Sequence, residues 1–152
     1  MTAPMRPQVT PLPKQGPKVK AKKKARAPKA ATLKNKATTL HSMVVRARAG
    51  YRCERCSRTD ARMECAHIFS RRYTATRADE TNAWCLCSGC HRYLTENPDE
   101  HVEFGKQTRG VEGYAQLKLK AYAGIGLTMK AEFWQGEVDR LNALLKEYTH
   151  VR

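Results

Sequence analysis

The sequence lacks long apolar runs and is poor in acidic residues. No hydrophobic stretch approaches the roughly 20 apolar residues of a membrane-spanning helix, and the N-terminal region has no apolar segment of the kind that directs secretion. We therefore expect a soluble, cytoplasmic protein without a membrane partner. Asp and Glu number 14 against 29 Lys and Arg, and the net charge of +15 favours a nucleic-acid partner over a small-molecule substrate. A basic protein with no specific polyanion partner is the alternative, because net charge alone does not define a site.

Residues 1–36 differ in composition from the rest of the chain. They contain eleven Lys or Arg, six prolines and no Asp or Glu, with Lys22, Lys23 and Lys24 in the densest basic run. Such a segment buries too little apolar surface to offset the entropy cost of ordering it, so we predict a disordered basic arm. These lysines are candidates for contacts with nucleic-acid phosphates, which would make the affinity fall steeply with salt. A solubilising or targeting tail is the alternative.

The first half of the remaining chain mixes helix and strand patterns, which predicts an α+β fold. Apolar residues at helical spacing predict a lead-in helix over about 37–49, with Gly50 as its left-handed terminator. Alternating residues predict a hairpin strand over about 62–69, and the polar segment 73–81 is expected to be a loop.

The second half is expected to be a helical tail. Pro98 suits the first turn of a helix over about 98–107, and a second helix is expected over about 111–123. Thr128 is the expected N-cap of a final helix. Its apolar residues recur at helical spacing and are interpreted as core, with an oligomer contact as the alternative. They are Phe133, Trp134, Val138, Leu141, Leu145 and Tyr148.

Four cysteines form two chelating pairs, Cys53-x2-Cys56 and Cys87-x2-Cys90. Four thiolates in two pairs suit tetrahedral zinc, and without an export signal metal binding is a better explanation than disulfides. A structural Zn²⁺ would close the largest loop of a small core and contribute to its folding. Cys85-x-Cys87 is an alternative chelating pair. The two-residue spacer favours Cys87 with Cys90, which leaves Cys65 and Cys85 as small buried apolar residues.

Between and directly after the cysteine pairs lie Glu64-Cys65-Ala66-His67-Ile68, Arg71-Arg72, Asn82 and His91. With these residues, the segment 51–97 resembles the HNH, or ββα-metal, nucleases, and within them the phage NinG recombination proteins. The resemblance implies a zinc-stabilised, treble-clef-like core in which a hairpin, a loop and a helix surround a divalent ion. It also implies a phage-encoded endonuclease that hydrolyses DNA phosphodiester bonds. The nuclease domain would span residues 37–97 and the helical extension residues 98–152.

The resemblance also implies a role for each polar residue. His67, with an ordinary pKa near neutrality, would take a proton from the attacking water, and Asn82 would fix the loop that orients it. His91 would ligate a catalytic Mg²⁺ or Mn²⁺ that contacts the scissile phosphate. Many HNH enzymes carry a metal-ligating Asp directly before the general base, where this chain has Ala66. Glu64 lies on the same strand face as Ala66 and is the expected replacement.

Several alternatives stay open at this point. Arg71 and Arg72 suit phosphate contacts, but they are equally compatible with a solvated loop. Asp79 or Glu80 could replace Glu64 at the catalytic ion, and His91 could ligate zinc in place of a cysteine. Because Ala66 removes a usual ligand, the rival interpretation is a non-catalytic zinc-finger protein that binds DNA or RNA. A zinc-bearing protein that binds structured RNA is a third.

Overall fold

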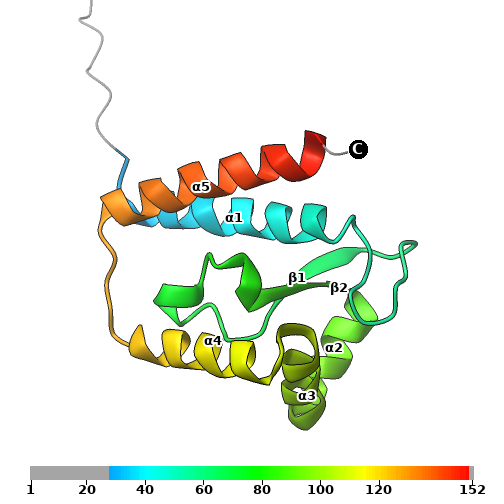
Figure 1. Cartoon of the computed structure of the whole chain (residues 1–152). Helices are drawn as coiled ribbons and strands as arrows, with labels where there is room; N and C mark the ends of the chain where they lie inside the picture. Colours follow the sequence, from blue (N-terminus) through cyan, green and yellow to red (C-terminus); the bar gives the residue numbers. More distant parts are fainter. Residues whose placement is uncertain (1–27, 151–152) are drawn as a thin grey trace, which may run out of the picture.

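The computed structural model describes residues 28–150, which form an α+β fold of five α-helices and one two-stranded antiparallel sheet (Figure 1). The order along the chain is α1 (Ala30–Arg48), β1 (Met63–His67), β2 (Ala83–Cys87), α2 (Ser88–Glu96), α3 (Pro98–Arg109), α4 (Val111–Ala123) and α5 (Ala131–His150). Two short 3-10 turns, Thr74–Thr76 and Glu80–Asn82, lie in the segment between the strands. The predicted α+β class is confirmed.

The first helix begins earlier than the sequence pattern indicated. The lead-in helix was expected over about 37–49, whereas α1 starts at Ala30, so the predicted start of the helix is wrong. The reason is tertiary, because Leu33 and Ala37 are buried in a cluster with residues of α5. The helix ends before Gly50, whose φ of 60° confirms the predicted left-handed terminator. Lys22, Lys23 and Lys24 lie outside the described residues.

Helices α1 and α5 lie side by side and form one layer of the molecule (Figure 1). Trp134, Val138 and Leu141 of α5 are at most 2% exposed and pack in one cluster with the apolar side of α1. The interpretation of the C-terminal stripe as core is confirmed for these three residues. Phe133, by contrast, is 38% exposed. Thr128 is not the N-cap, because α5 begins only at Ala131.

The sheet and helices α2 to α4 form the second core. Trp84 of β2 is fully buried, and its Nε1 donates a hydrogen bond to Thr108 Oγ1 of α3 at 2.8 Å. Helix α4 packs against the segment between the strands, and the approach is close at Gly124, where an added Cβ would lie 2.5 Å from Ala75 Cβ. The segment between the strands, residues 68–82, thus lies between α4 and α1 (Figure 1). Among the described helices, none has both the length and the apolar character needed to span a membrane.

The pairing of the two strands determines which side chains share a face. Opposite residues run from Met63 with Cys87 to His67 with Ala83. Because side chains alternate along a strand, Cys65 and His67 point to one face and Glu64 and Ala66 to the other. The first face is covered by α1 and the second by α2, as the contacts described below show.

Candidate functional site

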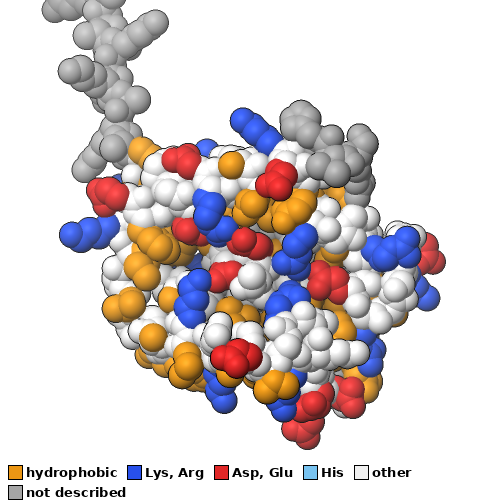
Figure 2. All heavy atoms as spheres, viewed as in Figure 1, with side chains coloured by type: hydrophobic (Ala, Val, Ile, Leu, Met, Phe, Trp, Pro, Cys, Tyr) orange, Lys and Arg blue, Asp and Glu red, His pale blue; other side chains and the backbone are white. Residues whose placement is uncertain are grey.

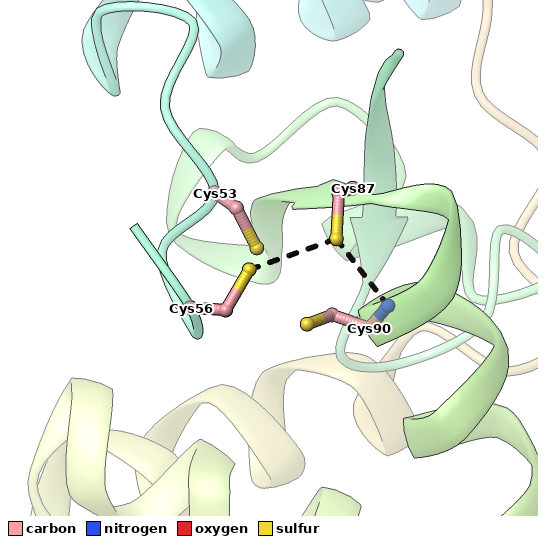
Figure 3. A group of neighbouring side chains, drawn as sticks. All are labelled: Cys53, Cys56, Cys87 and Cys90. Atoms are coloured by element: carbon pink, nitrogen blue, oxygen red, sulfur yellow. Dashed lines mark hydrogen bonds between the residues drawn. The ribbon is translucent and has the colours of Figure 1, made fainter. Parts of the chain in front are cut away.

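The four paired cysteines converge at one end of the sheet, where their side chains point toward a common centre (Figure 3). All four sulfur atoms lie within 4.8 Å of one another, and Cys56 Sγ is 3.8 Å from Cys87 Sγ. A tetrahedral zinc ion with Zn–S bonds of about 2.3 Å separates its sulfur ligands by about 3.8 Å. The cluster therefore fits a structural metal ion, and the donor set is the one that zinc prefers.

The local folding of the two pairs explains this convergence. Cys87 ends β2 and Cys90 lies in the first turn of α2, where its backbone N–H donates to Cys87 Sγ at 3.5 Å. The turn that carries the other pair is attached to β2 through Glu54. Its backbone N–H donates to the Cys85 carbonyl at 2.8 Å, and its carboxylate accepts from the Cys85 N–H at 3.2 Å. Arg48 of α1 holds the same carboxylate at 2.9 Å.

Burial and hydrogen bonds shift the pKa values of two cysteines of the cluster in opposite directions. Burial opposes ionisation of Cys53, but hydrogen bonds from the backbone at Cys87, Cys56 and Arg55 outweigh it and lower its pKa to about 7. Burial and, to a smaller extent, hydrogen bonds with the adjacent cysteines together raise the pKa of Cys90 to about 12, against the lowering effect of the Arg55 hydrogen bond. The Cys90 thiol therefore keeps its proton at neutral pH in the absence of a cation, and binding of a divalent metal would displace that proton.

The cluster also decides between the alternative ligands. Among the described residues that could hold a metal, Cys85 and His91 do not belong to the four-cysteine group. Cys85 is fully buried, in agreement with its interpretation as an apolar core residue, whereas Cys65 is only half-buried. The outer side of the cluster is covered by Arg55, whose guanidinium lies 3.9 Å from Cys90 Sγ and 4.1 Å from the centre of the Tyr93 ring.

Glu64 and His91 meet on the face of the sheet that α2 covers. His91 Nδ1 lies 2.7 Å from a carboxylate oxygen of Glu64, and both side chains are about one-third exposed, at 37% for His91 and 33% for Glu64. They line a shallow hollow of about 250 Å³ together with Ser88, Arg92, Thr95 and Glu96. Ala66, on the same face, is only 3% exposed and offers no ligand atom.

His67 lies on the opposite face, under α1. One ring nitrogen, Nε2, is 3.2 Å from the carbonyl oxygen of Arg77, and the ring centre is 5.0 Å from that of His41. Burial, as the main cause, and the nearby His41 together lower the pKa of His67 to about 4. In the folded chain the pKa of His67 is therefore well below its intrinsic value near neutrality, because folding removes water from the ring. The structure does not bring His67 and His91 into one cluster of described ligand residues.

Asn82 is fully buried and holds the segment that follows His67. Its side-chain oxygen accepts a hydrogen bond from the Phe69 N–H at 2.8 Å. Its amide group donates to the carbonyl oxygens of Phe69 at 2.9 Å and Thr76 at 3.0 Å. The asparagine thus connects the start and the middle of the segment between the strands.

The two candidate phosphate-binding arginines lie on an exposed part of the same segment. The Arg71 carbonyl accepts a hydrogen bond from Arg77 at 2.8 Å. Arg72 donates to the Tyr73 hydroxyl at 2.9 Å, with its guanidinium 4.9 Å from the Tyr73 ring centre. Figure 2 shows a face on which basic and acidic side chains are mixed. Residues 28–150 contain 20 Lys and Arg against 14 Asp and Glu, so residues 1–27 contribute more than half of the net charge.

Two histidines of the site have no counterpart in the sequence-based predictions. His41 of α1 is fully buried, its Nε2 lies 2.9 Å from the Asp79 carbonyl oxygen and its Nδ1 lies 3.7 Å from Cys65 Sγ. Its position between Leu40 and Val44, on the apolar side of the helix, was the available signal. His101 of α3 contacts Trp84 and hydrogen-bonds the backbone of His67, and burial lowers its pKa. Nothing in the local sequence marks His101.

The chain is thus an α+β protein with a four-cysteine group that fits a metal, an adjacent carboxylate–histidine pair and a separate histidine cluster under α1. Comparison with protein families, curated proteins and solved structures gives no match.

Proposed function

We propose that the chain is a metal-dependent endonuclease of the HNH, or ββα-metal, type that hydrolyses phosphodiester bonds of DNA. The observation that carries the proposal is the contact between Glu64 of β1 and His91 of α2, at 2.7 Å, in an open hollow beside the four-cysteine group. A hairpin strand and a helix that jointly present metal-ligating side chains are the arrangement expected from the resemblance to HNH nucleases.

The pair fits a divalent ion such as Mg²⁺ or Mn²⁺. In an octahedral shell with bonds of about 2.1 Å, adjacent ligand atoms are about 3.0 Å apart, close to the 2.7 Å between His91 Nδ1 and Glu64 Oε2. A mixed set of carboxylate and imidazole ligands suits Mn²⁺. The same set would suit Mg²⁺ if more water molecules completed its coordination shell. Glu64 replaces the ligand that is missing at Ala66. When bound, the ion would neutralise charge that develops on the scissile phosphate and stabilise the leaving oxygen.

His67 would act as the general base. Its low pKa keeps the ring neutral at pH 7, so that it retains a lone pair for the proton of an attacking water. The Arg77 carbonyl accepts from Nε2 and would leave Nδ1 as the basic atom. His67 lies on the face of the hairpin under α1, and the Glu64–His91 pair lies on the face that α2 covers. Asn82 would act as a positioning residue through the segment that contains Arg77.

The substrate proposal rests on charge. The exposed Arg71 and Arg72 lie four and five residues after His67 and would contact phosphates next to the scissile bond. Lys22, Lys23 and Lys24 would add sequence-independent contacts, so we expect both binding and cleavage to weaken strongly with salt. Zinc in the four-cysteine group would be structural and would take no part in the reaction, because four protein ligands leave no open position.

A cleavage assay tests the proposal. Supercoiled plasmid is incubated with the full chain and Mg²⁺ or Mn²⁺, beside the variants Glu64→Gln, His91→Ala and His67→Ala. Each variant should lose at least about 10²-fold in nicking rate. Glu96→Gln is the matched control, because Glu96 lines the same hollow and is exposed on α2, whereas the carboxylate paired with His91 is that of Glu64. Equal nicking by all four variants would refute the mechanism, and zinc content verifies that each is folded.

A second candidate function is a non-catalytic, zinc-stabilised protein that binds DNA or RNA. The buried Ala66, which supplies no ligand, and the low pKa of His67, which makes it a weak base, favour this candidate. If this candidate is correct, the wild-type chain should retard nucleic acid in a gel but should not cut the plasmid. His67→Ala should then leave the affinity for nucleic acid unchanged.

A further inference from the structure

A second group of metal-ligating side chains lies under α1, on the opposite face of the sheet from Glu64 and His91. His41, Cys65 and His67 each offer one ligand atom, and these atoms lie within 4.8 Å of one another. We propose that this group is a second metal site, distinct from the four-cysteine group, which binds zinc or a comparable borderline-soft divalent ion through two imidazoles and one thiolate.

The orientation of both imidazoles supports the proposal. His41 Nε2 lies 2.9 Å from the Asp79 carbonyl oxygen, and His67 Nε2 lies 3.2 Å from the Arg77 carbonyl oxygen. A carbonyl oxygen only accepts, so each Nε2 carries the proton and each Nδ1 carries the lone pair. Metal-ligating histidines characteristically donate their other N–H to a backbone carbonyl, which fixes the tautomer and the ring. Cys65 Sγ lies 3.7 Å from His41 Nδ1, within the same group.

The surroundings indicate the type of site. Three protein ligands leave a fourth position of a tetrahedral ion open to water, unlike the closed four-cysteine group. Charged side chains interact electrostatically with each of the three ligands. Cys65 is close to the positive charges of Arg46, Arg48 and Arg71, and His67 to that of Arg77. His41 is close to the negative charges of Asp79 and Glu80. The excess of positive charge weakens the binding of a cation. We therefore expect an exchangeable ion held less tightly than the structural one.

Occupancy of this site would control the activity. If His67 is the general base, as proposed above, an ion on its Nδ1 occupies the lone pair that must take the proton. Zinc would then be a reversible inhibitor of the enzyme, acting on the face of the sheet opposite the Mg²⁺ or Mn²⁺ ligands. This consequence rests on the proposed function, whereas the metal site itself does not.

Cobalt is the probe for the site, because Co²⁺ bound to thiolate gives charge-transfer absorption that depends on the sulfur ligand. The full chain, with one equivalent of zinc already bound, is titrated with Co²⁺. We expect one further equivalent with sulfur-to-cobalt absorption for the wild type and for Cys85→Ser. Cys85 is the matched control, since it lies directly opposite Cys65 on β2 and belongs to no group of described ligand residues. Cys65→Ser should lose this absorption and bind Co²⁺ at least about 10-fold more weakly.

A second measurement does not depend on the folding of a variant. X-ray absorption at the cobalt edge of the wild-type complex should show one sulfur and two imidazole ligands. Binding of no further ion by the wild type, or the absence of a sulfur ligand from every bound cobalt ion, would overturn the proposal. In the plasmid assay, added Zn²⁺ should inhibit the wild type but inhibit Cys65→Ser at least about 10-fold less. A wild type that binds Co²⁺ with sulfur but never cuts DNA would refute the proposed function and leave the metal site established.

Discussion

Truncation of Asn82 tests how the segment between the strands is held. In Asn82→Ala, the Phe69 N–H and the carbonyl oxygens of Phe69 and Thr76 lose their hydrogen-bond partners. A buried polar group left without a partner costs about 1–3 kcal/mol. Water that enters the truncated site would recover part of the loss for these three adjacent groups, so we expect unfolding to require about 3 kcal/mol less free energy. For a chain of this size, that corresponds to a fall of about 10 °C in Tm.

The measurement is equilibrium unfolding in urea at fixed zinc concentration, followed by circular dichroism. Asn97→Ala is the control, because Asn97 also donates a side-chain hydrogen bond, to the Tyr93 carbonyl at 2.8 Å, but at an exposed helix end. It should cost only about 0.5–1 kcal/mol. The reasoning would be refuted by equal effects of the two substitutions, since the argument depends on the burial of the groups that Asn82 satisfies. Native zinc content in both variants shows that any difference arises in the segment and not in the cysteine group.

Two further predictions concern the metal group and the buried histidine. Cys87→Ser removes one of four thiolates, so the zinc that stays bound after dialysis has removed the exchangeable ion should fall well below one equivalent by mass spectrometry. Cys65→Ser should retain the structural ion under the same conditions, and equal zinc contents after dialysis would contradict the ligand assignment. Burial and His41 lower the pKa of His67 to about 4 in the folded state, whereas its pKa in the unfolded chain is about 6.5. The stability that the neutral ring contributes should therefore be complete above about pH 6.5 and be lost as the pH falls through 4. The loss should amount to about 3 kcal/mol. Urea unfolding at a series of pH values should show a smaller loss for His67→Gln, and parallel curves would disprove this origin.

Local patterns in the sequence predicted most of the elements and the structural metal ligands. The 111–123 helix has the predicted bounds, and the strand predicted over about 62–69 contains β1. The two cysteine pairs assembled as expected, because a Cys-x2-Cys turn brings its own sulfurs together and the pairing of β1 with β2 brings the turns together. Strand alternation also predicted that Glu64 shares a face with Ala66, and on that face Glu64 contacts His91.

Contacts between distant segments decided the remainder. The beginning of α1 at Ala30 depends on α5, which is distant in the sequence and supplies the apolar surface that covers Leu33 and Ala37. His41 became part of a ligand group only because α1 packs over β1, and no periodicity within either segment encodes that packing. The acidity of His67 is likewise a property of the folded chain, since removal of water from its ring lowers the pKa that its residue type would have in solution. The sequence by itself therefore determined which residues could act as ligands, through residue type and local spacing. Tertiary structure decided which of them meet and how each is protonated, because desolvation and long-range packing arise only when the layers close.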